Sequence, residues 1–574
     1  MERCWSSLYQ IVTYHKNKLL SACLAWCVSP VFLIDENLAN PFYQMAIQTA
    51  VVTESGENKV SIQARLPLGT RHFHGFQNVP NELVADACVI GSGASGAMVA
   101  NALQECGWSV IMVEEGSLLA REVSQEEVDS VSPAAEVRGE HGWEEHGWPW
   151  STRNVGGGTL FYGGASFRYH DCDFDASPWL SGIGLDIIWP INRTDLAKYY
   201  AIVEKQLRVS GGPHIDPAKS GSNALPMSLP ADIMAVTAKR LGYHPFPTPM
   251  AIDHKTCTLE KRCIDFQCPS GAKSDVINIY IKHLVTSRNF TLLSGIRGVA
   301  LEQERPEQIS ALRCLDLESG IIRHVRARYF FVACNAIQSA ALLLRSVTPF
   351  APSGIGNRHD LVGRGLCMKL SQRIRGMVTV TETMREHPVG LRGPFSTMAI
   401  LDHYLDTRCP SGMGGLIYEA RTLSPPSELS EQLPLELETI IADTPAYENR
   451  VRLSSHRDAW GMPKIMIDYR IAPHDMARIA YMADRGVAIL QAAGATQIYS
   501  KRSRSEEGST HLHGTCRSGI DPTRSVLDPN CRVHDLENLY VVDGSFMPFP
   551  GGLNPTLTIQ ANALRVARHV AGVD

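Results

Sequence analysis

Residues 86–96 read Asp86-Ala-Cys-Val-Ile90-Gly91-Ser-Gly-Ala-Ser-Gly96, a short apolar run that leads directly into three regularly spaced glycines. The apolar run has the composition of a buried strand, and the small residues at 97–105 predict a helix. A second apolar run at 109–113 ends at Glu114. A strand, a glycine-rich turn, a helix and a second strand in this order predict a βαβ unit of an α/β domain.

The spacing Gly-x-Gly-x-x-Gly between a strand and a helix is typical of a loop that binds a dinucleotide. Gly91 permits the tight turn, Gly93 lets the backbone approach a pyrophosphate, and Gly96 lets the helix pack against the strand. Glu114 follows Gly91 by 23 residues and is suited to bind an adenosine ribose and repel a 2′-phosphate, which argues against NADP. A glycine-rich turn without a ligand is the alternative. The predicted cofactor-binding residues here are Gly91, Gly93, Ala94, Ser95, Gly96 and Glu114.

The last part of the chain favours FAD over NAD. An apolar run at 539–542 ends at Asp543 and Gly544, a pair suited to hold the ribityl and phosphate part of a flavin. Further along, Asn554 and Pro555 stand immediately before a helical pattern at 557–570, which is the signature of a helix start. The amino terminus of that helix would stabilise the negative charge of a reduced flavin. A helix start without a ligand is the alternative.

A pair of histidines lies about 40 residues before Asn554, in His511-Leu-His513-Gly514-Thr515. Oxidation of an alcohol removes the hydroxyl proton and a hydride from the same carbon. A histidine accepts a proton near neutral pH, and a nearby amide such as Asn554 can hydrogen-bond the developing alkoxide. The residues alone do not separate His511 from His513, and either can have an ordinary structural role.

The composition excludes several classes of protein. The chain has 574 residues, too many for one small module, and a formal net charge of −5, which gives no reason to expect a nucleic-acid partner. With 44% hydrophobic and 20% charged residues it is neither disordered nor a multi-span membrane protein. Strand and helix patterns alternate at its beginning, middle and end. We therefore expect one nucleotide-binding domain built from separate segments, with a mixed α+β domain inserted between them.

The 15 cysteines are scattered along the chain and predict no disulfide framework. Cys257, Cys263 and Cys268 come nearest to a cluster, but their gaps of five and four residues do not match the CxxC pairs of structural zinc sites. We expect no metal site there.

The N-terminal segment fits no single template. Lys16 and Lys18 precede an apolar stretch at 19–34, which is interrupted by Ser21, Ser29 and Pro30. The stretch is shorter than the roughly 20 residues of a spanning helix, and a secretory signal has a shorter charged region before it. A signal sequence, membrane association through residues 16–34 and a packed or disordered extension are the alternatives. The location is therefore open between cytoplasmic and exported or membrane-associated.

Taken together, the motifs resemble those of the glucose–methanol–choline (GMC) flavoprotein oxidoreductases, from about residue 86 to residue 570. The pieces occur in the family's order. They are Gly91–Gly96 with Glu114, Val155–Gly164, Trp189–Leu196, Cys268–Lys273, Ala336–Arg345, Leu361–Arg364 and His511–Thr556.

The resemblance implies a Rossmann-like FAD-binding domain, interrupted by a substrate domain on a mostly antiparallel sheet. It also implies oxidation of an alcohol, sugar or polyol hydroxyl by hydride transfer to flavin N5. The family pattern H-x-x-G-T has its catalytic histidine three residues before the glycine, which is His511, and its second catalytic position falls on Asn554. By the same matching, the residues expected along the flavin are Gly157, Gly158, Thr159, Asp543, Gly544, Pro555 and Thr556.

Members with covalent flavin carry a histidine after the glycine loop, where this chain has Leu160, Phe161 and Tyr162. We therefore expect non-covalent FAD. The sequence looks most like the bacterial sugar and polyol dehydrogenase branch, so the expected partners are a small hydroxylated substrate and either oxygen or an electron-accepting protein or quinone. A lyase or tailoring enzyme of the same fold, and a non-catalytic flavin-bound partner protein, are the alternatives.

The resemblance also suggests domain boundaries. The expected segments are an N-terminal extension at 1–80, FAD-binding parts at 81–175, 255–349 and 505–574, and substrate-domain parts at 176–254 and 350–504. Substrate identity, oligomeric state, and the roles of residues 1–80 and of the three cysteines are left open.

Overall fold

A computed structural model of the chain describes residues 69–119, 131–132, 135–139, 142–146, 151–180, 185, 187–212, 223–260, 267–420, 429–502 and 509–573. The chain divides into Met1–Ala64 and Arg65–Asp574, and every described residue belongs to the second unit. The apolar stretch at 19–34 and Cys263 lie outside the described residues. No helix within the described ranges is long and apolar enough to cross a membrane.

The largest sheet has the strand order β1-β6-β3-β2-β9-β8-β7, with β17 beside β9. All pairs from β1 to β9, and the pair of β9 with β17, are parallel, whereas β7, β8 and β9 form an antiparallel meander. The predicted βαβ unit is confirmed. The strands are β1 (His72–His74), β2 (Val84–Ile90), β3 (Val110–Glu114), β6 (Phe290–Ser294), β7 (Ile296–Arg305), β8 (Gln308–Asp316), β9 (Ile322–Val332) and β17 (Leu539–Val541).

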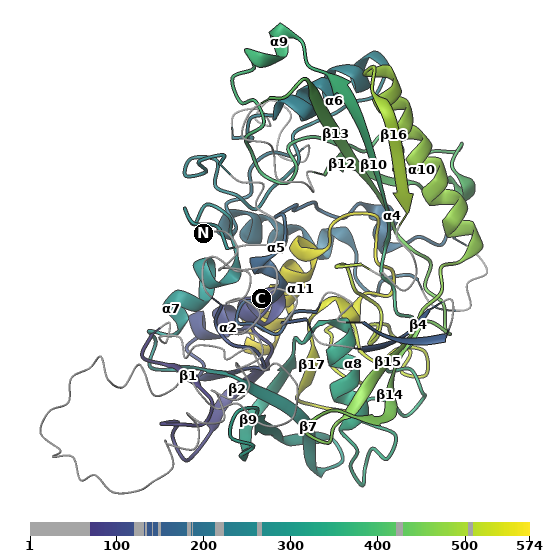
Figure 1. Ribbon diagram of the computed structural model, residues 1–574. Helices are drawn as coiled ribbons and strands as arrows, with labels where there is room; N and C mark the ends of the chain where they lie inside the picture. The colour runs from purple at the N-terminus through teal and green to yellow at the C-terminus, as the bar shows by residue number, and fades with distance from the viewer. Residues whose placement is uncertain are drawn as a thin grey trace, which may run out of the picture. The chain divides into compact units, whose positions relative to one another are not determined.

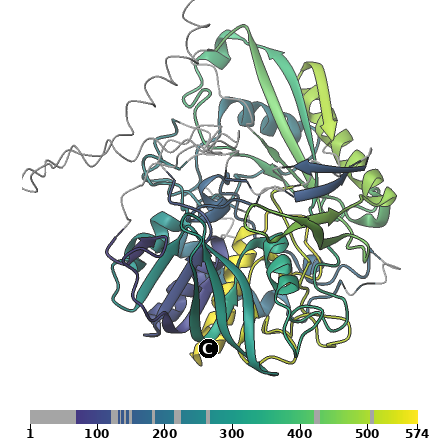
Figure 2. The ribbon, with the colours of Figure 1, turned by 60° about the horizontal axis from the view of Figure 1, so that its bottom comes forward.

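Four helices accompany this sheet, and the first and the last of them confirm the helices predicted at 97–105 and 557–570. They are α2 (Ala94–Glu105), α5 (Arg193–Gln206), α8 (Asn335–Arg345) and α11 (Thr556–Ala571). The last helix, α11, packs against both α2 and α5, so the end of the chain returns to the first βαβ unit (Figure 2). It begins after Asn554 and Pro555 and ends at Gly572, whose φ of 68° closes the helix in the left-handed conformation. A Rossmann-like domain assembled from distant segments is therefore confirmed.

A second sheet is antiparallel throughout and has the order β11-β12-β13-β10-β16. Helix α10 (Pro473–Ala492) lies along β10, β13 and β16, and α6 (Leu229–Arg240) contacts β13 and α10 (Figure 1). Ile374, Leu437, Ile479 and Met482 belong to the apolar core between this sheet and its helices. The strands are β10 (Leu370–Thr379), β11 (Ala399–Ile400), β12 (Gly415–Glu419), β13 (Gln432–Ile441) and β16 (Thr496–Arg502).

A third sheet, β14-β15-β4-β5, joins two parts of the chain that are far apart in sequence. Its strands are β4 (Ala135–Gly139), β5 (Gly142–His146), β14 (Arg450–Arg457) and β15 (Pro463–Asp468), and the pair of β4 with β15 is parallel. The first two strands fall in a predicted FAD-binding part and the last two in a predicted substrate part, and the domain boundaries stay a prediction. The short helical elements are η2 (Gly157–Leu160), α4 (Asp171–Phe174), η3 (Ile277–Ile281), α7 (Lys282–Leu284), α9 (Glu382–Arg385), η4 (Pro410–Gly412) and η5 (Gly544–Phe546).

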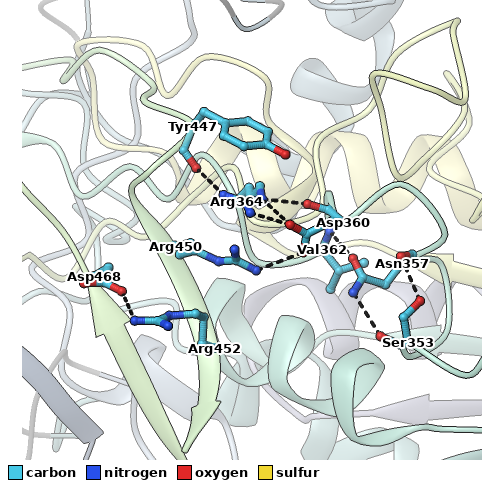
Figure 3. A network of polar contacts seen from close by, with 9 residues as sticks. All are labelled: Ser353, Asn357, Asp360, Val362, Arg364, Tyr447, Arg450, Arg452 and Asp468. Atoms are coloured by element: carbon cyan, nitrogen blue, oxygen red, sulfur yellow. Dashed lines mark hydrogen bonds and ion pairs between the residues drawn. The ribbon is translucent and has the colours of Figure 1, made fainter.

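A network of polar contacts holds the segment between α8 and β10 (Figure 3). The Asp360 carboxylate accepts hydrogen bonds from Arg364 and from Arg450 of β14. Arg364 also donates to the Tyr447 carbonyl at 3.2 Å. The network therefore ties this segment to the start of β14, and the same segment leads to Lys369, which lines the cavity described next.

Candidate active site

One cavity of ≈ 860 Å³ lies where the large parallel sheet, the segment before η5 and the antiparallel sheet come together. A volume of this size is near the upper end of small-molecule sites, which span about 300–1,000 Å³. All of the site residues predicted from the sequence line it except Gly96. Those lining it are Gly91, Gly93, Ala94, Ser95, Glu114, Gly157, Gly158, Thr159, His511, Asp543, Gly544, Asn554, Pro555 and Thr556.

Some glycines around the cavity are required by close backbone packing, and others leave space for a ligand. A Cβ on Gly91 would lie 2.4 Å from the Ala333 carbonyl oxygen, and a Cβ on Gly96 would lie 2.0 Å from the Gly91 carbonyl oxygen. These two glycines are required by the close packing of α2 on the strands. In the described part of the chain, a Cβ on Gly93 would have only the Gly157 Cα near it, at 3.9 Å, and a Cβ on Gly158 would meet nothing within 4 Å. Gly93 and Gly158 therefore keep the cavity open for a ligand.

Three helices begin at the cavity. The first residues or N-caps of α2, α8 and α11 all belong to its lining. None of the three helices has a side-chain cap hydrogen bond or an acidic residue in its first turn. Their N–H groups and positive dipole ends therefore favour an anionic ligand such as a pyrophosphate.

Glu114 lies at the end of β3, and its carboxylate is already partly bonded. It accepts hydrogen bonds from Ser92 N at 2.9 Å, from Ser92 Oγ at 2.7 Å and from Gly116 N at 2.9 Å. Burial raises the pKa of Glu114 to about 7 against the effect of these bonds. The side chain is thus fixed against the glycine loop at the edge of the cavity, where a bound ribose would give it further donors.

Asp543 has a similar anchoring role between α8 and η5. Its carboxylate accepts hydrogen bonds from Ser339 of α8 and from the backbone N–H of Ser545, which it caps at the start of η5. Burial raises its pKa. These bonds hold α8 and Gly544 together beside the cavity.

His511 and Asn554 meet at the cavity from segments 43 residues apart. Asn554 Nδ2 lies 3.4 Å from His511 Nε2. The Asn554 side chain also reaches the Tyr418 hydroxyl, and its buried Oδ1 has no hydrogen-bond partner among the described residues. Burial, together with the positive charge of Lys369, lowers the pKa of His511 to about 3. The imidazole is therefore neutral at pH 7 and able to accept a proton.

His513 lies differently. Its backbone exchanges two hydrogen bonds with that of Cys367, and its side chain is fully buried. Within the described ranges, neither ring nitrogen has a hydrogen-bond partner. It is absent from the residues found to line the cavity in the described part of the chain. The geometry therefore gives a substrate access to His511 and not to His513.

Several lining residues were missed by the sequence reasoning. Lys369 is buried, and its Nζ donates hydrogen bonds to the Tyr169 hydroxyl at 3.1 Å and to the Leu553 carbonyl. Burial lowers the pKa of Lys369 to about 7. Tyr418 and Glu438 reach the cavity from the antiparallel sheet. No sequence motif marks these three residues as part of a site. An acidic or basic residue within an otherwise apolar strand is the one feature of the sequence that could have indicated them.

The sequence comparisons agree with this geometry. Two models of the GMC oxidoreductase family match the chain, one over residues 85–371 and the other over residues 445–563. The chain belongs to the GMC oxidoreductase family. It is 48% identical to 6'''-hydroxyparomomycin C oxidase of Streptomyces lividus, over 88% of this chain and 94% of that protein. It is 47% identical to paromamine 6'-oxidase of Streptomyces fradiae, over 88% of this chain and 95% of that protein.

Dehydrogenases of the branch that the sequence was expected to resemble most are among the relatives, but at 25–27% identity they are less similar than the two oxidases. Among solved structures, pyridoxine 4-oxidase from "Mesorbium loti" has the same fold, with a TM-score of 0.57 and 19% sequence identity over 84% of this chain and 98% of that one. The GMC protein is therefore an FAD oxidoreductase that acts on the CH–OH group of a small hydroxylated substrate and passes electrons to an acceptor.

The cavity fits FAD. The open space beside Gly93, the three helix starts and Glu114 would hold a pyrophosphate and a ribose, as the dinucleotide-binding pattern requires. The unpaired Oδ1 of Asn554 gives a buried polar atom at the part of the cavity where His511 lies.

The two kinds of glycine predict two different defects. Gly96→Ala forces a Cβ onto the Gly91 carbonyl, so we expect destabilisation of about 3 kcal/mol or more, because overpacking against backbone has no easy relief. Gly93→Ala should leave thermal unfolding of the apoprotein nearly unchanged but weaken FAD binding about tenfold or more, because it narrows the approach to the backbone. Thermal unfolding and FAD titration measure the two effects. Equal changes in thermal stability and in FAD affinity for the two variants would contradict the different roles assigned to Gly96 and Gly93.

Proposed function

We propose that this oxidoreductase converts a hydroxyl group of an amino sugar to a carbonyl group, with His511 as the base and Asn554 as the group that hydrogen-bonds the reacting oxygen. The observation that carries the proposal is the 3.4 Å contact between His511 Nε2 and Asn554 Nδ2 in the cavity that also holds the glycine loop. The substrate class is supported by the two relatives at 47–48% identity, whose names specify oxidation of paromamine and of a paromomycin.

The roles follow from the protonation states of the two groups. When bound, FAD supplies the two-electron acceptor that oxidation of an alcohol requires. Neutral His511 accepts the hydroxyl proton on Nε2, and Asn554 Nδ2 donates a hydrogen bond to the oxygen, which becomes negatively charged as the proton leaves. A substrate oxygen placed between these two nitrogens replaces their mutual contact.

The charge of Lys369 affects the basicity of His511. Its cation lowers the pKa of His511, and its own pKa of about 7 means that it loses its proton just above neutral pH. As the pH rises through 7, the positive charge next to His511 decreases and the imidazole becomes a stronger base. Lys369 also holds the Leu553 carbonyl and so fixes the residue before Asn554.

The base is tested by replacing it. His511→Ala should lower the rate of flavin reduction by about 10²–10⁴-fold, the usual contribution of a general base, while the FAD content stays unchanged. The measurement is anaerobic stopped-flow absorbance with paromamine as the reductant.

His513→Ala is the matched control, because His513 lies two residues away but does not line the cavity in the described part of the chain. It should retain most of the reduction rate. A His511→Ala enzyme as fast as the wild type, or a loss confined to His513→Ala, would refute the assignment of the base.

The two relatives are named oxidases, so dioxygen is the acceptor we propose. With paromamine, the wild-type enzyme should consume one dioxygen and form one hydrogen peroxide for each hydroxyl group oxidised. An oxygen electrode and a peroxide assay measure this, with an artificial dye acceptor in parallel. Turnover with the dye alone would show that the acceptor is a protein or quinone, and no turnover with any amino sugar would reject the substrate class.

We propose that the FAD is bound non-covalently. The segment after the glycine loop presents Phe161 and Tyr162 to the cavity, and burial raises the pKa of Tyr162 and of the lining thiol Cys334, so neither is a ready nucleophile. Precipitation of the protein with acid should therefore release the yellow cofactor into the supernatant, where its absorbance is measured. Colour retained in the pellet after washing in denaturant would contradict this prediction.

A further inference from the structure

A row of four side chains crosses the antiparallel sheet and faces the cavity. In the strand register, Glu438 of β13 pairs with Tyr418 of β12 on one side and with Arg373 of β10 on the other, and Arg373 pairs with Lys501 of β16. All four residues line the cavity. Ile374 and Leu437, each one position along its strand, lie in the apolar core on the opposite side of the sheet. The alternation of a strand therefore directs the whole row to the cavity.

The four side chains of the row differ in how far they are exposed to solvent. Tyr418 and Glu438 are buried, with 3% and 8% of their surfaces exposed, whereas Arg373 and Lys501 are exposed. The Tyr418 hydroxyl donates a hydrogen bond to the Glu438 carboxylate at 2.9 Å and also lies against the side chain of Asn554. The carboxylate thus lies at the inner end of the row, one side chain away from the proposed reaction centre.

Glu438 is buried and faces the exposed Arg373 across the strand pair without an ion pair to it. Among the described residues, its side chain has the one hydrogen bond from Tyr418 and no ion pair. The neighbouring cross-strand pair behaves differently, because Glu436 forms an ion pair with Arg375 at 3.4 Å. Burial of an unpaired charge is costly. The cavity therefore contains a buried carboxylate that can gain an ion pair from a cationic ligand.

We infer that Glu438 binds an ammonium group of the substrate and thereby selects amino sugars over neutral sugars. The inference rests on the proposed function for the substrate class. Tyr418 links the carboxylate to Asn554, so a substrate held by its ammonium group at Glu438 places a hydroxyl group a short distance away at His511 and Asn554. Arg373 and Lys501 place positive charge at the exposed end of the row, so an ammonium group is most favourably placed at the inner end, beside Glu438.

The test compares Glu438→Gln with Glu436→Gln. The first variant keeps the shape of the side chain and an acceptor for Tyr418 but removes the charge, and the second removes a charge from the same strand outside the cavity lining. The holoenzymes are given paromamine and N-acetylated paromamine, which carries no ammonium groups. Two readouts are measured for each, kcat/KM and the Kd under anaerobic conditions by calorimetry.

We expect wild type and Glu436→Gln to prefer paromamine, and Glu438→Gln to lose at least about tenfold of that preference in both Kd and kcat/KM. An unchanged preference in Glu438→Gln, or no preference in the wild type, overturns the inference even if paromamine is oxidised. If the wild type binds paromamine with a Glu438-dependent preference but does not oxidise it, the ammonium site stands and the proposed function fails.

Discussion

The close approach of backbone to backbone at the first glycine loop positions the elements that surround the cavity. Gly96 lies against the Gly91 carbonyl, and Gly91 lies against the carbonyl of Ala333 at the end of β9. Because no side chain fits at either position, the start of α2 is held close to the ends of the central strands. This contact brings the helix amino terminus to the cavity and leaves Gly93 facing open space, where a pyrophosphate has room to bind.

The cavity exists because the chain returns to this point several times. Strand β17 adds to the parallel sheet beside β9, and α11 then packs on α2, so Asn554 and His511 come to the same cavity as a loop more than 400 residues earlier. One face of the antiparallel sheet lines the cavity, and the other face of the sheet is covered by α10 and α6. The large sheet therefore lines the part of the cavity that contains the glycine loop, and the antiparallel sheet lines the part that contains Tyr418 and Glu438.

The cavity contains a buried lysine and a buried carboxylate at different places in its lining. Lys369 donates to Tyr169 and to the Leu553 carbonyl, and its cation adds to the effect of burial in lowering the pKa of His511. Glu438 lies at another part of the cavity without a cationic partner among the described residues. A cavity with three helix amino termini, a buried lysine and an unpaired carboxylate suits an anionic cofactor and a cationic substrate together.

The βαβ unit, the apolar run at 539–542, the helix after Pro555 and the glycine loop could all be predicted from the sequence, because each depends on residues close together in the chain. Family resemblance was needed to choose His511 over His513, since the two histidines look alike locally. The sequence did not show that Lys369, Tyr418 and Glu438 line the same cavity or that β4 pairs with β15. These contacts depend on which distant segments lie side by side after folding, and the local pattern of a strand does not identify its partner.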